Sequence, residues 1–321
     1  MTGRNLSSWL ATVLALWPTG SLVANPAMTF QGMANASAAV RVGSDRVLVG
    51  SDENNVLQLY SVTGGPPLAG FETSQWLGLQ TRNREVDFEG AARLGDITFW
   101  LGSHGRNNSG EARPDRQRLL ALRVEAEDSR LILKPLGPAL TTLLDQLIAS
   151  PKYARFQLAE AAQRAPEAPG GLNFEGLAAG PRNSLLLGLR NPVPEGKALV
   201  IPLLNPFEAI VGKPAEFGDP VQLDLGGKGI RDLAWTGRDY FIAAGSAEGG
   251  GKTTIYRWAG VSEPPVLIDT PKFKSLNPEA IVYFESPAPG RCLLLSDDGG
   301  RSSNETRNFS QRTFRGLWIT P

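Results

Sequence analysis

The sequence is poor in cysteine and histidine and carries no net charge. Its 321 residues include one Cys and one His, and 32 Lys and Arg residues balance 32 Asp and Glu residues. One cysteine excludes a fold held together by disulfides within the chain, and the apolar neighbours of Cys292 indicate a buried thiol. Since no run of Lys and Arg interrupts the charge balance, we expect no nucleic-acid partner.

Several catalytic motifs are also missing. The chain has no GxSxG, HExxH or CxxC motif, so nothing indicates a serine hydrolase, a zinc peptidase or a dithiol site. The stretch "SAEGGGKTT" (Ser246 to Thr254) resembles a phosphate-binding loop, but a serine replaces its first glycine and a strand pattern follows it. We interpret it as a glycine-rich hairpin loop.

The N-terminus lacks an apolar run long enough to anchor the chain in a membrane. Residues 1–24 contain one early Arg, an apolar run from Trp9 to Trp17 and then small residues. This order is typical of a secretory signal peptide, cleaved after Ala24 or after Ser21, although a buried N-terminal helix is the alternative. We therefore predict a mature protein of residues 25–321, periplasmic or secreted, without a membrane span.

Five copies of one pattern follow. Each has a strand, a tight turn, a second apolar strand, a polar loop and a third strand, and the copies start at Asn35, Asp87, Asn173, Ile230 and Asn277. The starts are 52, 86, 57 and 47 residues apart. A period of about 50 residues with three or four strands per unit is typical of a β-propeller. The sequence therefore predicts an all-β, five-bladed β-propeller in one domain, with six blades as the alternative.

Two further segments complete this prediction. The fifth repeat ends at its third strand, and we expect "AMTFQG" (residues 27–32) to supply the missing fourth strand and close the ring. The long interval holds residues 137–171, whose apolar side chains recur at helical spacing on both sides of Pro151. We expect two short helices there, inserted between two blades.

The polar residues that open the repeats are predicted to gather at one mouth of the channel. In a hairpin the start of the first strand lies beside the end of the second, which would place Asp87 opposite His104 and Asn173 opposite Arg190. Aligning the repeats forms one ring of Ser37, Glu89, Glu175, Asp232 and Glu279. A neighbouring ring contains Asn35, Asp87, Asn173 and Asn277, and Asp297 ends a second strand.

Converging carboxylates repel one another unless a cation, Arg or Lys partners, or raised pKa values intervene. We therefore regard the following residues as candidate ligands of a divalent cation, with Ca²⁺ the natural ion for oxygen ligands: Glu89, Glu175, Asp232 and Glu279. The alternative is structural, with each Glu accepting hydrogen bonds from backbone N–H groups of the next blade.

The residues that occur once are the better candidates for chemistry. His104 with Asp87 could form a general base, although a lone His in a turn is more often a hydrogen-bonded loop residue. The candidate ligand-binding residues are Arg190, Asn173, Arg106, Asn277 and Asp297. They would suit a small polar or anionic ligand. The sequence does not identify a protein partner, but in a binding or scaffolding propeller the insertion of residues 137–171 would form part of the partner surface.

Several quoted segments resemble one family. "DFEGAA", "WLGSHGRNNSGEARPDRQRLLAL", "GLNFEGLAAGP", "GIRDLAW" and "LNPEAIV" look like the bacterial family catalogued as domain of unknown function 3616, over nearly all of the mature chain. The family implies no established activity. Its first repeat opens with Asp-Ala-Ser, whereas Asn35 stands first here, which removes one carboxylate from the rim.

More distantly, the Asp/Asn-x-Glu-Gly openings resemble exported propellers described as phytase-like or esterase-like, and the fold is analogous to calcium-dependent nucleotidases. Two functions therefore compete. The first is a propeller that binds a small polar ligand or a cation at its rim. The second is a metal-dependent hydrolase of phosphate or carboxylic esters, with His104 and Asp87 as base and Arg190 and Arg106 binding the anion.

Overall fold

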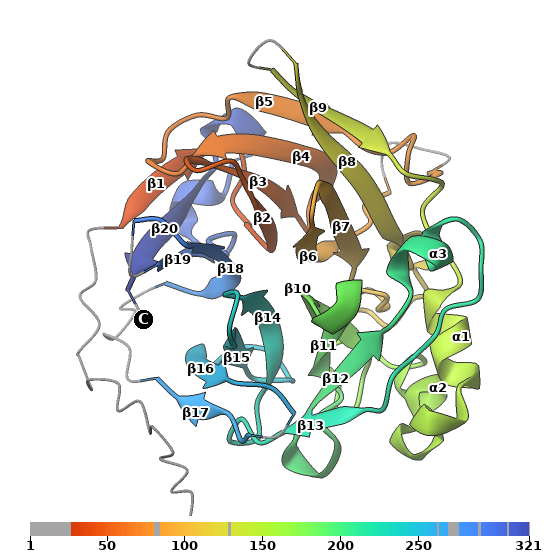
Figure 1. Ribbon diagram of the computed structural model, residues 1–321. Coiled ribbons are helices and arrows are strands. Elements are labelled where there is room, and N and C mark those ends of the chain that lie inside the picture. The colour runs from red at the N-terminus through yellow and green to blue at the C-terminus, as the bar shows by residue number, and fades with distance from the viewer. Residues whose placement is uncertain are drawn as a thin grey trace, which may run out of the picture.

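Five four-stranded antiparallel sheets surround a central channel, as Figure 1 shows. The computed structural model describes residues 27–79, 84–127, 130–261, 263–268, 276–287, 290–306 and 308–320. The predicted signal peptide, residues 1–24, lies outside this part of the chain. The predicted five-bladed propeller is confirmed, and the six-bladed alternative is wrong.

Each blade contains four strands, numbered from the channel outward in the first four blades. Blade 1 contains β2 (Ala38–Val42), β3 (Arg46–Ser51), β4 (Asn54–Ser61) and β5 (Ala69–Glu72). Blade 2 contains β6 (Phe88–Leu94), β7 (Ile97–Gly102), β8 (Leu119–Glu127) and β9 (Arg130–Pro135). Blade 3 contains β10 (Asn173–Ala179), β11 (Leu185–Asn191), β12 (Ala198–Leu203) and β13 (Val221–Leu223). Blade 4 contains β14 (Gly229–Trp235), β15 (Tyr240–Gly245), β16 (Thr254–Trp258) and β17 (Val266–Leu267).

The last blade joins the two ends of the described chain. It contains β18 (Pro278–Phe284), β19 (Arg291–Ser296) and β20 (Thr313–Ile319), and β1 (Met28–Gln31) is its outermost strand. Strand β1 runs antiparallel to β20, with Met28 opposite Gly316 and Gln31 opposite Thr313. The predicted closing strand is therefore confirmed, and it covers an edge that β20 would otherwise expose.

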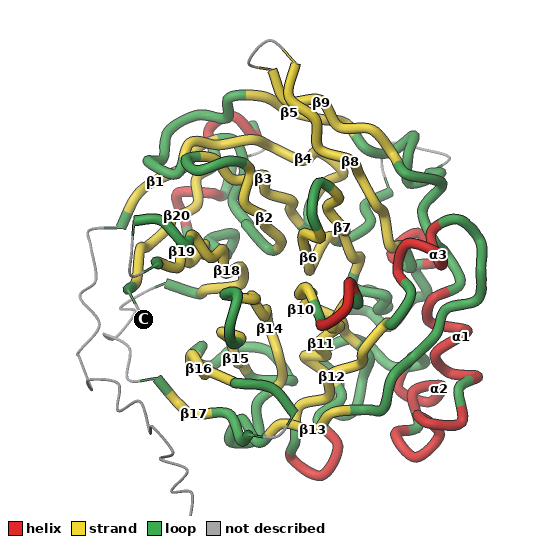
Figure 2. The backbone as a smooth tube through the Cα atoms, viewed as in Figure 1, coloured by secondary structure: helices red, strands yellow, loops and turns green. Residues whose placement is uncertain are grey.

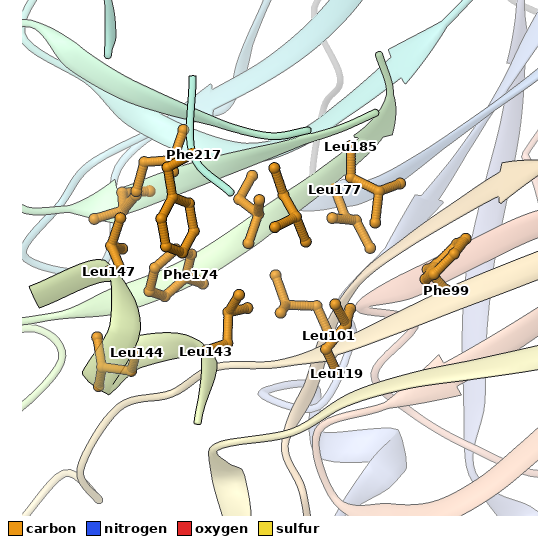
Figure 3. Packing of buried hydrophobic residues seen from close by; sticks show 14 of the residues in the cluster. Phe99, Leu101, Leu119, Leu143, Leu144, Leu147, Phe174, Leu177, Leu185 and Phe217 are labelled. Carbon is orange, nitrogen blue, oxygen red and sulfur yellow. The ribbon is translucent and has the colours of Figure 1, made fainter. Parts of the chain in front are cut away.

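The hydrophobic core lies between blades, because each inner sheet is covered on both faces. All seven residues of β11 are buried, as expected for a sheet that faces a neighbour on each side. Figure 3 shows the cluster between blades 2 and 3, which includes Phe99 and Leu101 of β7 and Phe174 and Leu177 of β10. The other four blade interfaces have clusters of the same kind.

The predicted insertion packs against one side of the ring. It contains α1 (Leu143–Ala149), a 3-10 helix (Pro151–Phe156) and α2 (Leu158–Ala161), and Leu143, Leu144 and Leu147 of α1 join the cluster between blades 2 and 3. A third helix, α3 (Pro206–Ile210), was not predicted from the sequence; it lies on the same side of the ring (Figure 2). Its single turn is too short to give a helical period. Further 3-10 turns lie at Pro114–Arg116, Pro181–Asn183, Pro194–Gly196, Ser302–Asn304 and Phe309–Gln311.

The predicted register of the inner hairpins is wrong because four of them contain a β-bulge. In blade 2, Phe88 lies opposite Gly102 and Gly90 opposite Leu101, so Glu89 is the extra residue. The Asp87 carbonyl accepts a hydrogen bond from Ser103 N–H, one residue before His104. Blade 3 likewise pairs Asn173 with Asn191 and not with Arg190.

Candidate functional site

A polar cavity of about 1430 Å³ lies at the channel mouth where the inner strands begin. Its wall combines the starts of β6, β10 and β18, the ends of neighbouring second strands, and loops from the insertion and from Gly250 to Thr254. Nine of its lining residues are Asp or Glu and five are Arg or Lys. The wall is therefore acidic by four formal charges when every group is ionised.

The β-bulges decide which side chains face this cavity. The extra residue is Glu89 in blade 2, Glu175 in blade 3, Arg231 in blade 4 and Glu279 in blade 5. All four side chains line the cavity. A bulge re-aims the side chain of its extra residue, which explains how a buried inner strand presents a charged group to the channel.

Arg231, and not Asp232, therefore belongs to the ring of glutamates. The sequence prediction aligned Asp232 with the glutamates and made it a metal ligand, and the register corrects that alignment by one residue. The signal was present in the sequence: an apolar or Pro residue precedes each glutamate, as Phe174 and Pro278 do, and Ile230 precedes Arg231. The cavity consequently contains a built-in cation where a fourth carboxylate was expected.

Asp232 has a structural role at the blade interface. It is 5% exposed and does not line the cavity, and its carboxylate accepts hydrogen bonds from the N–H groups of Leu233 and Ile281, at 2.8 and 2.7 Å. Burial raises the pKa of Asp232 well above its ordinary value, against the lowering effect of these bonds. The structural alternative proposed for the glutamates thus applies to Asp232, which ties blade 4 to blade 5.

The glycine after the bulged glutamate permits close packing of blades. A Cβ on Gly176 would lie 2.8 Å from Ile230 Cγ2 in blade 4, and one on Gly90 would lie 2.9 Å from Leu177 Cβ in blade 3. Real Cβ atoms do not approach so closely, so a larger residue would push the blades apart. The Glu-Gly pair therefore combines a channel-facing charge with a blade contact.

In blade 3 a buried ion pair organises the rim. Arg190 Nη1 lies 2.7 Å from Glu175 Oε1, and both side chains are less than 10% exposed. Asn173 Nδ2 donates to the same oxygen at 2.7 Å, and Arg190 Nη2 reaches Glu167 of the insertion at 3.0 Å. Arg190 also donates through Nε to the Ser246 carbonyl, so it fastens blade 3 to the insertion and to blade 4.

Blades 4 and 5 share a second buried pair. Arg231 Nη1 contacts Glu279 Oε1, and Asn277 Nδ2 donates to the same oxygen at 3.3 Å. Asn277 Nδ2 also lies 3.3 Å from Asp297 Oδ2. The Asn-x-Glu opening therefore works in the same way in blades 3 and 5, with the amide of the Asn supporting a carboxylate that an Arg neutralises.

Two more arginines pair with carboxylates on the other side of the cavity. Arg116 from the loop after β7 contacts Asp87 Oδ2 at 2.7 Å and Glu85 Oε1 at 2.9 Å. Arg312 contacts Glu53 Oε1 at 2.6 Å. Each of the four arginines that line the cavity thus contacts a carboxylate.

Three lining carboxylates remain without an ion pair to a described Arg or Lys side chain: those of Asp52, Glu89 and Asp297. Burial, followed by the charge of Asp87, raises the pKa of Asp52 to about 7, although Asn35 opposes the shift with a 2.9 Å hydrogen bond. Burial and the charge of Glu175 raise the pKa of Glu89 well above its ordinary value. The three carboxylates without an ion pair thus come from blades 1, 2 and 5.

One lining amide also has an oxygen that could accept a hydrogen bond from a ligand. Asn173 is 5% exposed, and its Oδ1 has no hydrogen-bond partner among the described residues, while its Nδ2 is committed to Glu175. A buried acceptor without a donor costs free energy, so a ligand N–H, O–H or cation at this position would be stabilised. Within the described residues, no three His, Cys, Asp or Glu side chains form a group that could hold a metal ion.

His104 and Arg106, two of the predicted site residues, point away from the cavity. His104 is 2% exposed, its ring packs 5.3 Å from that of Phe174, and its Nδ1 lies 2.8 Å from the Gly102 carbonyl. Burial lowers the pKa of His104 to about 4. Arg106 donates to the carbonyls of Ala162 and Gly110, which fixes its loop to the insertion. Asp87 pairs with Arg116 and not with His104.

The structure brings eight of the eleven predicted site residues to the cavity wall: Asp87, Glu89, Asn173, Glu175, Arg190, Asn277, Glu279 and Asp297. His104, Arg106 and Asp232 lie outside it. The sequence also placed Asp52 and Glu53 at this rim, at the end of a second strand, but gave them no ligand role. It did not place the following lining residues: Glu85, Arg116, Glu167, Arg231, Lys252 and Arg312. Apart from Arg231, these residues come from loops and strand ends whose positions no repeat pattern specifies.

Fold and cavity together define an all-β, five-bladed propeller with an acidic channel mouth. The family model described as "Protein of unknown function (DUF3616)" matches residues 137–275, within the region whose motifs resemble that family. No curated protein matches the sequence. Within the described residues, no helix is long and apolar enough to span a bilayer.

Among solved structures, the chain is similar to a glutaminyl cyclase from Myxococcus xanthus. The two share 11% identity with a TM-score of 0.47, over 94% of this chain and 98% of that one. A PQQ-bound aldose sugar dehydrogenase from Streptomyces coelicolor gives the same four values.

Proposed function

We propose that this protein is an exported binding propeller whose acidic cavity takes a small polar ligand carrying positive charge, either an ammonium group or a divalent cation such as Ca²⁺. The observation that carries the proposal is the set of three carboxylates, Asp52, Glu89 and Asp297, that face one cavity without an Arg or Lys partner in the described chain. Burial and, after it, repulsion between neighbouring carboxylates raise the pKa values of Asp52 and Glu89, and a bound cation would offset both effects.

The cavity also has a size suited to such a ligand and room for its neutral part. Its volume of about 1430 Å³ exceeds that of one hydrated ion, and Asn173 Oδ1 can accept a hydrogen bond from an N–H or O–H group. An anionic ligand is less favoured, because each lining arginine already contacts a carboxylate. Export, inferred from residues 1–24, belongs to the same proposal.

The alternative, a metal-assisted ester hydrolase, has less support from this geometry. It needs a general base beside the bound ester, and the predicted base, His104, is packed against Phe174 behind the cavity wall. Asp87 lines the cavity but is held by Arg116. We therefore favour binding over hydrolysis.

Thermal melting with added cations tests the proposal. We expect CaCl₂ or putrescine to raise the melting temperature saturably, beyond the effect of NaCl at equal ionic strength, because a ligand bound only by the folded state stabilises it. Glu89→Gln should weaken the response about tenfold, since it removes one unpaired carboxylate. The matched control is Glu216→Gln, an exposed glutamate outside the cavity. Equal responses in the two variants, or no response to either cation, would contradict the proposal.

A further inference from the structure

A second cavity, of about 680 Å³, lies at the opposite mouth of the channel. It is lined by the second halves of β2, β6, β10, β14 and β18 and by the turns that follow four of them. It shares no lining residue with the acidic cavity. Its volume is within the range of small-molecule sites.

Two arginines from neighbouring blades face this second cavity. Arg41 of β2 and Arg93 of β6 both line it, and Arg93 Nη1 donates to the Arg41 carbonyl at 2.9 Å. Arg93 Nε donates to the Gly95 carbonyl at 2.7 Å, so the guanidinium is held in place by backbone and not by a carboxylate. Burial and the nearby charge of Arg41 lower the pKa of Arg93, as expected where two cations share one mouth.

Among the described lining residues, the negative charge on this wall is one exposed carboxylate. Glu285 is the one Asp or Glu among the described lining residues, and its carboxylate lies 3.3 Å from Arg41 Nη1. The Glu285 side chain is 72% exposed, which makes this contact a weak surface ion pair. An anionic ligand could take its place against Arg41 at low cost.

Across the mouth an aromatic side chain is presented to solvent in a fixed position. Trp235 is 40% exposed and lines the cavity, and its ring lies 4.7 Å from that of Tyr240. Tyr240 in turn contacts Trp258 and donates a hydrogen bond to the Ala179 carbonyl. A large exposed aromatic held rigidly at a cavity edge is typical of binding surfaces, because its apolar face stays hydrated until a ligand covers it.

The floor between the arginines and Trp235 is apolar. Leu177, Leu233 and Ile281 line the cavity and are at most 4% exposed as residues. This mouth therefore combines a cationic side, an apolar floor and an aromatic wall. Its charge is opposite in sign to that of the acidic mouth.

From this arrangement we infer a second binding site, for a small carboxylate that carries an apolar or aromatic body. The carboxylate would contact the guanidinium groups of Arg41 and Arg93, displacing Glu285. The body would lie over the apolar floor and against Trp235. Guanidinium groups match carboxylates geometrically, and the aromatic ring adds contact area at little entropic cost.

Calorimetric titration with benzoate tests this inference on the full chain. We expect a saturable heat with benzoate, and affinity at least about tenfold lower for benzamide, which lacks the charge, and for acetate, which lacks the ring. Absence of a saturable heat with benzoate, or equal affinity for benzamide, would overturn the inference.

Variants locate the binding. Arg41→Gln and Trp235→Ala should each weaken benzoate binding by about tenfold, whereas Arg46→Gln, which removes the same charge from the same hairpin outside the cavity wall, should leave it unchanged. Near-ultraviolet circular dichroism checks that each variant is folded. If Arg41→Gln does not fold, Arg93→Gln replaces it as the arginine variant. Equal affinities in the Arg41 and Arg46 variants would place the benzoate elsewhere.

Discussion

At the scale of single residues, one position of the repeat carries a glutamate in three blades and an arginine in a fourth. The bulge presents Glu89, Glu175 and Glu279 to the channel, and it presents Arg231 in blade 4. Arg231 contacts Glu279, so the arginine at this position provides one glutamate with a permanent counterion. Glu89 has no comparable partner in the described chain, and burial and the charge of Glu175 raise its pKa. It is therefore the first residue to test.

Asp52 gives a prediction about pH. Its pKa is raised to about 7 in the folded protein, above the ordinary value of 3.8, so the folded state binds this proton more tightly than the unfolded state. The stabilisation that the bound proton gives the folded state is therefore fully present below about pH 4 and is lost as the pH rises through about 7. Replacing the carboxyl with a neutral amide, Asp52→Asn, should raise the free energy of unfolding at pH 8 by up to about 4 kcal/mol, with little effect at pH 4, because each pKa unit corresponds to about 1.4 kcal/mol.

Urea denaturation at both pH values, with chelator present, measures this difference. Asp45→Asn is the control, because Asp45 is exposed in the turn before β3 and its replacement should change stability equally at the two pH values. A wild type as stable as Asp52→Asn at pH 8 would show that the Asp52 carboxylate is well accommodated.

At the scale of elements, the closing strand is the least local feature of the fold. Strand β1 has four residues, and its hold on the last blade depends on Phe30, which is fully buried. The Phe30 ring stacks on Phe314 with centroids 4.7 Å apart and meets Tyr60 of blade 1 edge-on at 5.6 Å. One side chain therefore fastens β1 both to its own blade and to the next.

Removing this side chain should loosen the ring. We expect Phe30→Ala to lower the free energy of unfolding by about 3 to 5 kcal/mol, as found for fully buried aromatic residues. Met28→Ala in the same strand should cost about 1 kcal/mol, because Met28 is only partly buried. Urea denaturation followed by tryptophan fluorescence measures both, and equal losses in the two variants would mean that β1 closes the ring through its backbone alone.

The elements also show where sequence patterns succeed. Alternating and continuous apolar runs predicted the strands and the closing segment, because burial between blades requires such runs. The bulges were missed, since one extra residue leaves the apolar pattern intact while shifting every pairing after it. Helix α3 was missed because five residues are too few to repeat a helical period.

At the scale of the whole molecule, the channel has two chemically different mouths. The inner strands begin at an acidic cavity and end at one that carries Arg41, Arg93 and Trp235. Because the cavities have no lining residue in common, ligands at the two mouths should bind independently.

Benzoate and CaCl₂ can be used together to measure whether the two mouths bind ligands independently. The benzoate dissociation constant should stay within about twofold when CaCl₂ is saturating, and Glu89→Gln should leave it unchanged, because distant sites without shared contacts are additive to about 0.5 kcal/mol. A larger change would mean that the five inner strands transmit a response from one mouth to the other.

The sequence by itself determined the blade number, the closing strand and eight of the residues at the acidic mouth. It could do so because these features repeat, and each copy of the pattern confirms the others. Only the tertiary structure decided which charged side chain enters the channel, because a bulge moves that choice by one residue, from Asp232 to Arg231. It also showed that His104 lies outside the acidic cavity. A turn residue can face a cavity or a neighbouring blade, and the His104 ring packs against Phe174 of the neighbouring blade.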